Sequence, residues 1–248
     1  MEKLINHFYI LLLLLAICLT LPLNAQVVDE EPPKPSLYVP QNDEIHINQN
    51  PSLFQGFSLS ADLLGPVLAL MNDYGDLSAS LQLNLRNRYF PVVELGYGSC
   101  DTKDVNTEIA YKTSAPFARI GFDYNLLRDR TQPNKFLLGF RYGISDYRFD
   151  ISGPSMIDPI WGTSAPYAYS DISALSHWAE VVIGVQVRIW KSFHMGWTVR
   201  YKYEISTTNN KYSRPFYIPG YGTTTDTSAW SGTYSLIFDL NWGLKKNQ

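Results

Sequence analysis

The chain has 248 residues, of which 45% are hydrophobic, 14% aromatic and 17% charged, and its formal net charge is −3. This apolar content excludes a fully disordered chain. The slightly acidic balance argues against a nucleic-acid-binding protein, which would carry a basic patch. The length permits one domain or two.

The first 25 residues have the pattern of a secretory signal peptide. Lys3 precedes an apolar run from Phe8 to Leu21, and Ala25 supplies the small residue at the cut. The run is shorter than the roughly 20 residues that a helix needs to cross a bilayer, so we expect cleavage and not an anchor. The expected organisation is a signal peptide at 1–25, a proline-rich polar periplasmic leader at 26–53 and a barrel domain at 54–248.

The chain contains two cysteines, and they fall on either side of the expected cleavage site. Cys18 lies in the signal peptide, so the mature chain would hold Cys100 alone and could form no internal disulfide. Lipid attachment at Cys18 stays an alternative, although Ile17 is larger than the small residue that normally precedes such a cysteine.

From Phe57 onward, apolar and polar residues alternate with a period of two, which predicts strands with two different faces. Leu77, Ala79 and Leu81, for example, alternate with Ser78 and Ser80. The apolar segment 65–71 begins with Gly-Pro, so we expect a loop there. The eight expected strands lie near 57–63, 77–86, 93–98, 118–124, 136–144, 179–189, 195–205 and 234–242.

The polar face of these strands favours a membrane barrel over a soluble ligand-binding barrel. Glycine is frequent on that face, where it would weaken a solvated strand but suits the crowded interior of an eight-stranded barrel. The charges there have both signs, as an internally paired lumen requires. The expected luminal charge network comprises Glu94, Arg119, Asp123, Arg141, Glu180, Arg188, Arg200, Lys202, Glu204 and Asp239.

The apolar face carries aromatic residues near both strand ends, which predicts two girdles at the membrane interfaces. One rim is expected to hold Phe90, Tyr124, Phe136, Trp190, Phe193 and Trp242, and the other Tyr97, Phe117, Tyr142, Trp178, Tyr203 and Tyr234. Short turns near 87–90, 125–135 and 190–192 alternate with long connections at 65–76, 99–114, 146–176 and 206–231. Outer-membrane barrels place short turns in the periplasm and long loops outside. The expected fold is an all-β, eight-stranded antiparallel up-and-down transmembrane β-barrel.

The region from Phe57 to Trp242 resembles the small outer-membrane β-barrels of Gram-negative bacteria, of the OmpA/OmpX type. Residues 234–242 are similar to the terminal strand by which such barrels are recognised for assembly, although six further residues follow. Segments 89–98, 177–180 and 217–222 are similar to an uncharacterised family of predicted barrels from anaerobic gut-type Gram-negatives. The resemblance implies an outer-membrane location, with membrane lipid and the assembly machinery as partners.

The sequence predicts no catalytic, cofactor or metal site. It has no closely spaced Cys or His pair and no ordered Asp loop. His177 lies beside Ser176 and near Glu180, but alternation places His177 on the lipid side and Glu180 in the lumen. An outer-membrane lipid hydrolase or acyltransferase is therefore kept as an alternative. A narrow solute channel is another, although eight strands leave an interior filled by side chains.

Aromatic residues in the two longest outer connections form a candidate binding loop. Exposed aromatics of this kind suit contact with an extracellular glycan or protein. Alternatively, they pack on each other and cap the barrel. The sequence thus predicts a non-enzymatic outer-membrane barrel that acts structurally or through its outer loops. The candidate loop residues are Trp161, Tyr167, Tyr169, Tyr217 and Tyr221.

Overall fold

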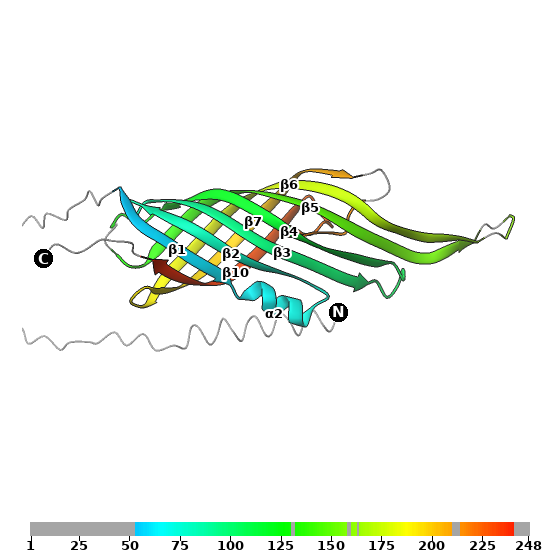
Figure 1. Ribbon diagram of the computed structural model, residues 1–248, viewed down its shortest axis with the longest axis horizontal. Helices are drawn as coiled ribbons and strands as arrows, with labels where there is room; N and C mark the ends of the chain where they lie inside the picture. Colours follow the sequence, from blue (N-terminus) through cyan, green and yellow to red (C-terminus); the bar gives the residue numbers. More distant parts are fainter. Residues whose placement is uncertain (1–52, 130–131, 158–159, 163, 210–213, 241–248) are drawn as a thin grey trace, which may run out of the picture. The chain divides into compact units, whose positions relative to one another are not determined.

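A computed structural model describes residues 53–129, 132–157, 160–162, 164–209 and 214–240. The expected signal peptide, the leader through residue 52, and Trp242 lie outside the described residues. The described chain forms a closed barrel with the strand order β1-β10-β7-β6-β5-β4-β3-β2 (Figure 1). The predicted all-β, eight-stranded antiparallel fold is confirmed.

Each barrel strand pairs antiparallel with its neighbours along the chain, and β10 closes the barrel onto β1. A separate small hairpin, made of β8 (Tyr217–Ile218) and β9 (Gly222–Thr223), lies in the connection between β7 and β10. The topology is therefore up-and-down, with one inserted element. The barrel strands are β1 (Phe54–Asp62), β2 (Tyr74–Leu85), β3 (Tyr89–Lys103), β4 (Ala110–Asn125), β5 (Lys135–Ile157), β6 (Ser164–Trp190), β7 (Phe193–Asn209) and β10 (Ser228–Leu240).

Short turns gather at one end of the barrel, as predicted. The turn 86–88 joins β2 to β3, the turn 191–192 joins β6 to β7, and the connection 126–134 joins β4 to β5. We call this the short-turn end and the opposite one the long-loop end. The long-loop end carries the tips of β3 to β7 and the β8–β9 hairpin.

Over most of the barrel height, polar side chains point inward and apolar side chains outward. On β6, Val181, Ile183 and Val185 are 47%, 49% and 41% exposed on the outer surface, whereas Glu180 and Gln186 are buried inside. This arrangement is the reverse of a soluble protein, in which the apolar face would fill the core.

Toward the long-loop end, the two faces exchange character. Tyr147 and Phe149 of β5 point inward and are buried, whereas Arg148 is exposed on the outside. Arg148 forms an exposed ion pair with Asp171 (2.9 Å). The barrel therefore ends in a segment with a polar exterior and an apolar interior, next to the apolar outer band. Its buried apolar cluster comprises Cys100, Tyr111, Ala115, Phe117, Tyr147, Phe149, Ile172, Ala174, Trp178, Tyr217, Ile218 and Tyr221.

This exchange explains why the expected connections were too long. The predicted connection 146–176 is mostly strand, because β5 continues to Ile157 and β6 begins at Ser164. In the same way, 99–114 and 206–231 contain the ends of β3, β4, β7 and β10. In much of these segments the period of two continues with apolar residues such as Cys100, Tyr147 and Ile172 on the inner face, whereas Trp230 of β10 still faces outward at 72% exposure.

Three residues assigned to the aromatic girdles lie inside the barrel instead. Phe90, Phe117 and Trp178 are buried at 0%, 3% and 0% exposure. Successive side chains of a strand point to opposite faces. Each of these three residues is an odd number of positions away from the outward-facing residues of its strand, so its side chain points inward. Their assignment to the outer surface was wrong. Tyr97 and Tyr203, by contrast, are 51% and 52% exposed on the outside.

Residues 65–71, expected to be a loop, lie in a short helix, α2 (Leu64–Met71). The Asp62 carboxylate accepts hydrogen bonds from the backbone N–H groups of Leu64 (3.1 Å) and Gly65 (3.2 Å). Pro66 lies in the first turn, where a helix tolerates a residue without an N–H. Among the described residues, no helix has the length and apolar character needed to cross a bilayer.

Candidate functional site: the luminal charges and the inserted loop

Four charged side chains from four different strands meet in the lumen, and we call them the central quartet: Glu94, Arg119, Glu180 and Arg200. The Arg119 Nε lies 2.9 Å from the Glu180 Oε1, and the Arg200 Nη1 lies 3.0 Å from the Glu94 Oε2 and 3.2 Å from the Glu180 Oε2. Arg119 also pairs with Glu94. Each carboxylate therefore contacts both guanidinium groups. Trp178 adds a hydrogen bond from its indole Nε1 to Glu180 (2.7 Å).

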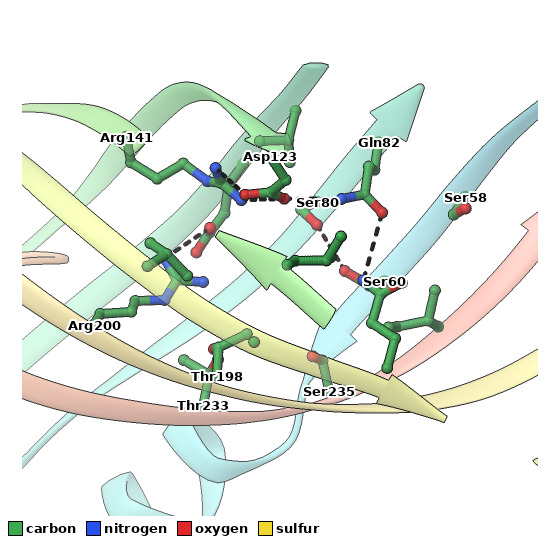
Figure 2. A pocket seen from close by; sticks show the side chains of 17 residues that line it. Ser58, Ser60, Ser80, Gln82, Asp123, Arg141, Thr198, Arg200, Thr233 and Ser235 are labelled. Carbon is green, nitrogen blue, oxygen red and sulfur yellow. Dashed lines mark hydrogen bonds and ion pairs between the residues drawn. The ribbon is translucent and has the colours of Figure 1, made fainter. Parts of the chain in front are cut away.

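A second ion pair lies nearer the short-turn end of the lumen. Arg141 of β5 contacts Asp123 of β4 at 2.7 Å, and Gln82 of β2 donates to the same carboxylate at 2.8 Å. The surrounding cavity is small, with a volume of about 60 Å³. Figure 2 shows this ion pair beside Arg200 and a set of hydroxyl groups that line the cavity: Ser58, Ser60, Ser80, Thr198, Thr233 and Ser235.

The connection between β7 and β10 folds into the long-loop end of the lumen, and we call residues 214–227 the inserted loop. Lys202 donates to the backbone carbonyls of Gly220 (2.8 Å) and Tyr221 (2.9 Å), and Arg119 also donates to Gly220. Tyr111 donates to the Tyr217 carbonyl at 2.9 Å. The inserted loop is therefore bound directly to the central quartet.

Tyr217 and Tyr221 anchor the inserted loop as buried, neutral hydrogen-bond donors. The Tyr217 hydroxyl donates to Asp76, and the Tyr221 hydroxyl donates to the Thr227 carbonyl at 2.9 Å. Burial raises the pKa of Tyr221 to about 12 and that of Tyr217 further above its usual value. Both phenols therefore keep their protons at any physiological pH.

Carboxylates pair with the three buried arginines of the lumen: those of the quartet satisfy each other, and Asp123 faces Arg141. Buried Lys202 contacts backbone carbonyls of the inserted loop, and buried Lys135 lies over the Phe90 ring. Such a compensated arrangement fixes neighbouring strands to one another. In the described part of the chain, no group of three or more His, Cys, Asp or Glu residues is placed to hold a metal ion.

The sequence matches one family model, described as a domain of unknown function, DUF6048, over residues 5–240. The chain belongs to this family. No curated protein and no solved structure is a match. Membership of DUF6048 agrees with the expected relation to an uncharacterised family.

In this DUF6048 chain, three members of the expected luminal network lie at its periphery. Arg188 is exposed near the short-turn end, where its Nε lies 3.4 Å from His194. Asp239 accepts a hydrogen bond from Ser58 (2.7 Å) at the same end. Glu204 pairs with Arg214 of the inserted loop (2.8 Å). The remaining seven expected residues are buried in the lumen: Glu94, Arg119, Asp123, Arg141, Glu180, Arg200 and Lys202.

The residues of the candidate binding loop separate into two groups. Trp161 and Tyr169 are 79% and 42% exposed at the tip of the β5–β6 hairpin, and Tyr167 is partly buried against Tyr169 with ring centroids 5.6 Å apart. Tyr217 and Tyr221 are each 1% exposed in the inserted loop. The second group therefore caps the barrel, which is the alternative that the sequence left open.

The residues considered for catalysis lie on opposite faces of the wall. His177 points outward and stacks on Tyr142, whose hydroxyl lies 3.0 Å from the His177 Nδ1. Ser176 points inward and contacts Tyr147 (3.1 Å), and Glu180 is also inside. The alternation predicted this separation correctly, and the wall backbone keeps His177 away from both.

Sequence reasoning missed several residues that complete the site. Trp178 and Tyr111 lie beside the quartet and the inserted loop, respectively. Trp178 could have been found from strand parity, because it directly precedes the outward-facing Ala179. The roles of Asp76 and Gln82 could not, since their partners come from distant parts of the chain.

The inserted loop depends on a glycine at its innermost point. Gly220 has φ +82°, and a Cβ atom there would come within 2.5 Å of the Phe117 ring. We expect Gly220→Ala to displace the loop and to accelerate hydrogen–deuterium exchange of residues 214–227, because strain and a steric clash act together.

Gly162 supplies the matched control, because it also has a positive φ (+64°) but has open space around its Cβ position. Gly162→Ala should therefore leave exchange of residues 214–227 unchanged. Equal exchange in the two variants and the wild type would contradict the close contact between Gly220 and Phe117.

Proposed function

We propose that the chain is a non-enzymatic outer-membrane β-barrel protein that acts structurally or through its long-loop end. The apolar outer band is the observation that carries this proposal. Every barrel strand contributes a large outward-facing apolar side chain, exposed by 36% or more, whereas the charges of the central quartet are buried inside. Water would not stabilise a surface of this kind, but lipid acyl chains would. One such residue per strand is Leu59, Leu81, Leu95, Ile120, Phe140, Val181, Val199 and Phe238.

The two ends of the band fit the two sides of a membrane. At the long-loop end, the outer surface changes to charged residues, including the exposed pairs Lys112–Asp101 (2.8 Å) and Arg148–Asp171 (2.9 Å). At the other end, short turns close the strands, as on the periplasmic side of outer-membrane barrels. The expected signal peptide supports export across the inner membrane, with the assembly machinery and membrane lipid as partners.

The β5–β6 hairpin is the surface that we propose for recognition. It extends past the last pairs of β5 with β4 (Ala110–Ser152) and of β6 with β7 (Ala174–Asn209). Its tip presents Ile160 and Trp161, which are 81% and 79% exposed. Binding residues concentrate on loops held by a rigid scaffold, so a glycan or protein ligand would contact this tip.

The contents of the lumen favour a structural role over transport. The central quartet bridges β3, β4, β6 and β7, and the inserted loop lies above it at the long-loop end. A solute would have to displace paired, buried charges, which is costly. A lipid-modifying enzyme is also disfavoured, since His177 is separated by the wall from Ser176 and Glu180.

Topology is tested by thiol labelling on intact cells in a Cys100→Ser background. We expect a membrane-impermeant reagent to label Ser164→Cys, at the β5–β6 tip, but not Lys191→Cys, at the β6–β7 turn. Labelling at Lys191→Cys alone would reverse the orientation and remove the β5–β6 tip as a surface for extracellular ligands. Deletion of residues 156–169 should leave the barrel folded while abolishing ligand binding.

A further inference from the structure

The barrel wall has a gap between β2 and β10 on the side of the long-loop end. β1 ends at Asp62, and its last pairs are Ala61–Ala79 with β2 and Asp62–Ser235 with β10. Beyond these pairs, within the described chain, β2 continues over 74–78 with pairing to β3 alone, and β10 continues over 228–233 with pairing to β7 alone. Two strand edges thus face each other without a strand between them.

Helix α2 occupies this gap. It follows β1 directly and lies beside β2 and β10 (Figure 1). Its eight residues rise about 12 Å, close to the roughly 13 Å of barrel height that about five residues of a tilted strand supply. Gly75 permits the contact with β2, because a Cβ atom there would come within 2.3 Å of the Ala69 Cβ.

The start of α2 is tied to β10 by hydrogen bonds. The Leu63 N–H donates to the Tyr234 carbonyl (2.8 Å), and the Tyr234 N–H donates to the Asp62 carboxylate (3.2 Å). Asp62 also accepts hydrogen bonds from the first N–H groups of α2. The carboxylate of this one residue, at the end of β1, therefore caps the start of α2 and also binds the backbone of β10.

The composition of α2 does not suit contact with water. The segment LGPVLALM contains no polar side chain, yet Val67, Leu70 and Met71 are 48%, 89% and 48% exposed. A helix on the surface of a soluble protein has a polar outer face, whereas a helix that is apolar all round is buried in protein or lipid. The exposed residues on either side of the gap are also apolar: Leu77 of β2 at 60% and Trp230 of β10 at 72%.

We propose that α2 is a membrane-embedded part of the barrel wall, with its outward face against the acyl chains of the outer leaflet. This inference rests on the proposed function. Continuity with the flanking apolar band selects lipid as the occupant. A second copy of the chain is a poorer fit, because a stable interface buries roughly 800 Å² per partner, far more than an eight-residue helix offers.

In this position, α2 separates the polar lumen from the surrounding lipid. The lumen behind the gap is polar and includes Ser78 of β2, Asp62 of β1 and Thr233 of β10. Backbone groups of an open strand edge are costly in hydrocarbon, which is why membrane barrels are normally closed by strands. α2 covers the gap with a segment whose own backbone groups are hydrogen-bonded along the helix, so it separates the polar lumen from lipid.

The experiment uses spin labels on the full mature barrel in vesicles of phosphatidylcholine and phosphatidylglycerol. Labels are attached at Leu70→Cys or Val67→Cys on α2, at Val185→Cys on the outer band, and at Val105→Cys in the β3–β4 loop, each in a Cys100→Ser background. Val105 is 91% exposed and Val185 is 41% exposed. Heat-modifiable gel migration confirms that each variant is folded.

We expect the α2 labels to behave like that at Val185, with strong relaxation by oxygen, which concentrates in lipid, and weak relaxation by a water-soluble nickel chelate. Nickel access at α2, with lipid exposure at Val185, would overturn the inference and leave the proposed function standing. Nickel access at the α2 labels and at Val185 would overturn the inference and the proposed function together. Exclusion of both relaxants at α2 would show that protein covers the helix, which also overturns the inference.

Discussion

Removal of the Glu180 carboxylate should be among the most destabilising single changes in the barrel. Glu180→Ala leaves Arg119 and Arg200 each without one of its two carboxylate partners and leaves the Trp178 indole unpaired. Breaking a buried ion pair by removing one partner typically costs about 3–5 kcal/mol. Urea titration of the barrel in vesicles, read by gel migration, measures this free energy of unfolding.

The matched control removes an exposed ion pair on the same wall. Arg148→Ala breaks the pair with Asp171, whose side chains are 70% and 69% exposed, so it should change the stability little. A double-mutant cycle of Glu180→Ala with Arg200→Ala should show strong coupling. Additive effects in this cycle would contradict the quartet as an energetic unit.

The second large effect is expected on the outer band. Val185 is 41% exposed and pairs in register with Trp197, another outward-facing apolar residue. If the band lies in a bilayer, Val185→Arg should cost about 2–4 kcal/mol of unfolding free energy near the midplane. If the band faced water, an arginine at this already exposed position would cost little.

Two further substitutions define the comparison for Val185. Val105→Arg introduces the same change at a position that is 91% exposed in the β3–β4 loop, and it should be nearly neutral. Gln186→Arg places the charge inside the polar lumen, where we expect a smaller cost than at Val185, set by crowding. Equal stability of the Val185→Arg and Val105→Arg variants would argue that the outer band faces water.

The period of two was sufficient to predict the barrel, because a closed antiparallel sheet imposes a single rule on every strand. It also placed Val182 and Ile237 on the polar side despite their apolar character, and both are buried inside, at 4% and 3% exposure. The inward faces of the charged residues follow from the same rule. Local pattern therefore determines which face a residue occupies.

The same pattern could not predict where the two faces exchange character. Residues 146–150 alternate just as 136–144 do, but in them the apolar positions, Tyr147 and Phe149, face inward. Both segments satisfy a period of two, and the period alone does not show whether the apolar residues face outward or inward. Loops were expected in these segments because each strand was assumed to end where its outward-facing apolar residues end.

The inserted loop, helix α2 and the pairing within the quartet were not predicted, because each depends on contacts between residues distant in the sequence. The inserted loop is held by Lys202 and Tyr111 through backbone carbonyls, a group that every residue carries, so the sequence does not reveal which residues accept these bonds. Helix α2 depends on Asp62, whose carboxylate acts on both the helix and β10. Pairing partners in the quartet depend on how strands are staggered around the barrel, which alternation does not specify.

We propose that the outer band of this barrel contacts membrane lipid, and this contact should decide where the chain folds. The most direct measurement is to purify the mature chain and compare its folding in vesicles with its folding in buffer alone. We predict folding in vesicles, with faster gel migration of unheated than of boiled samples, and aggregation in buffer. A monodisperse, folded monomer in buffer without detergent or lipid would show that the outer band faces water.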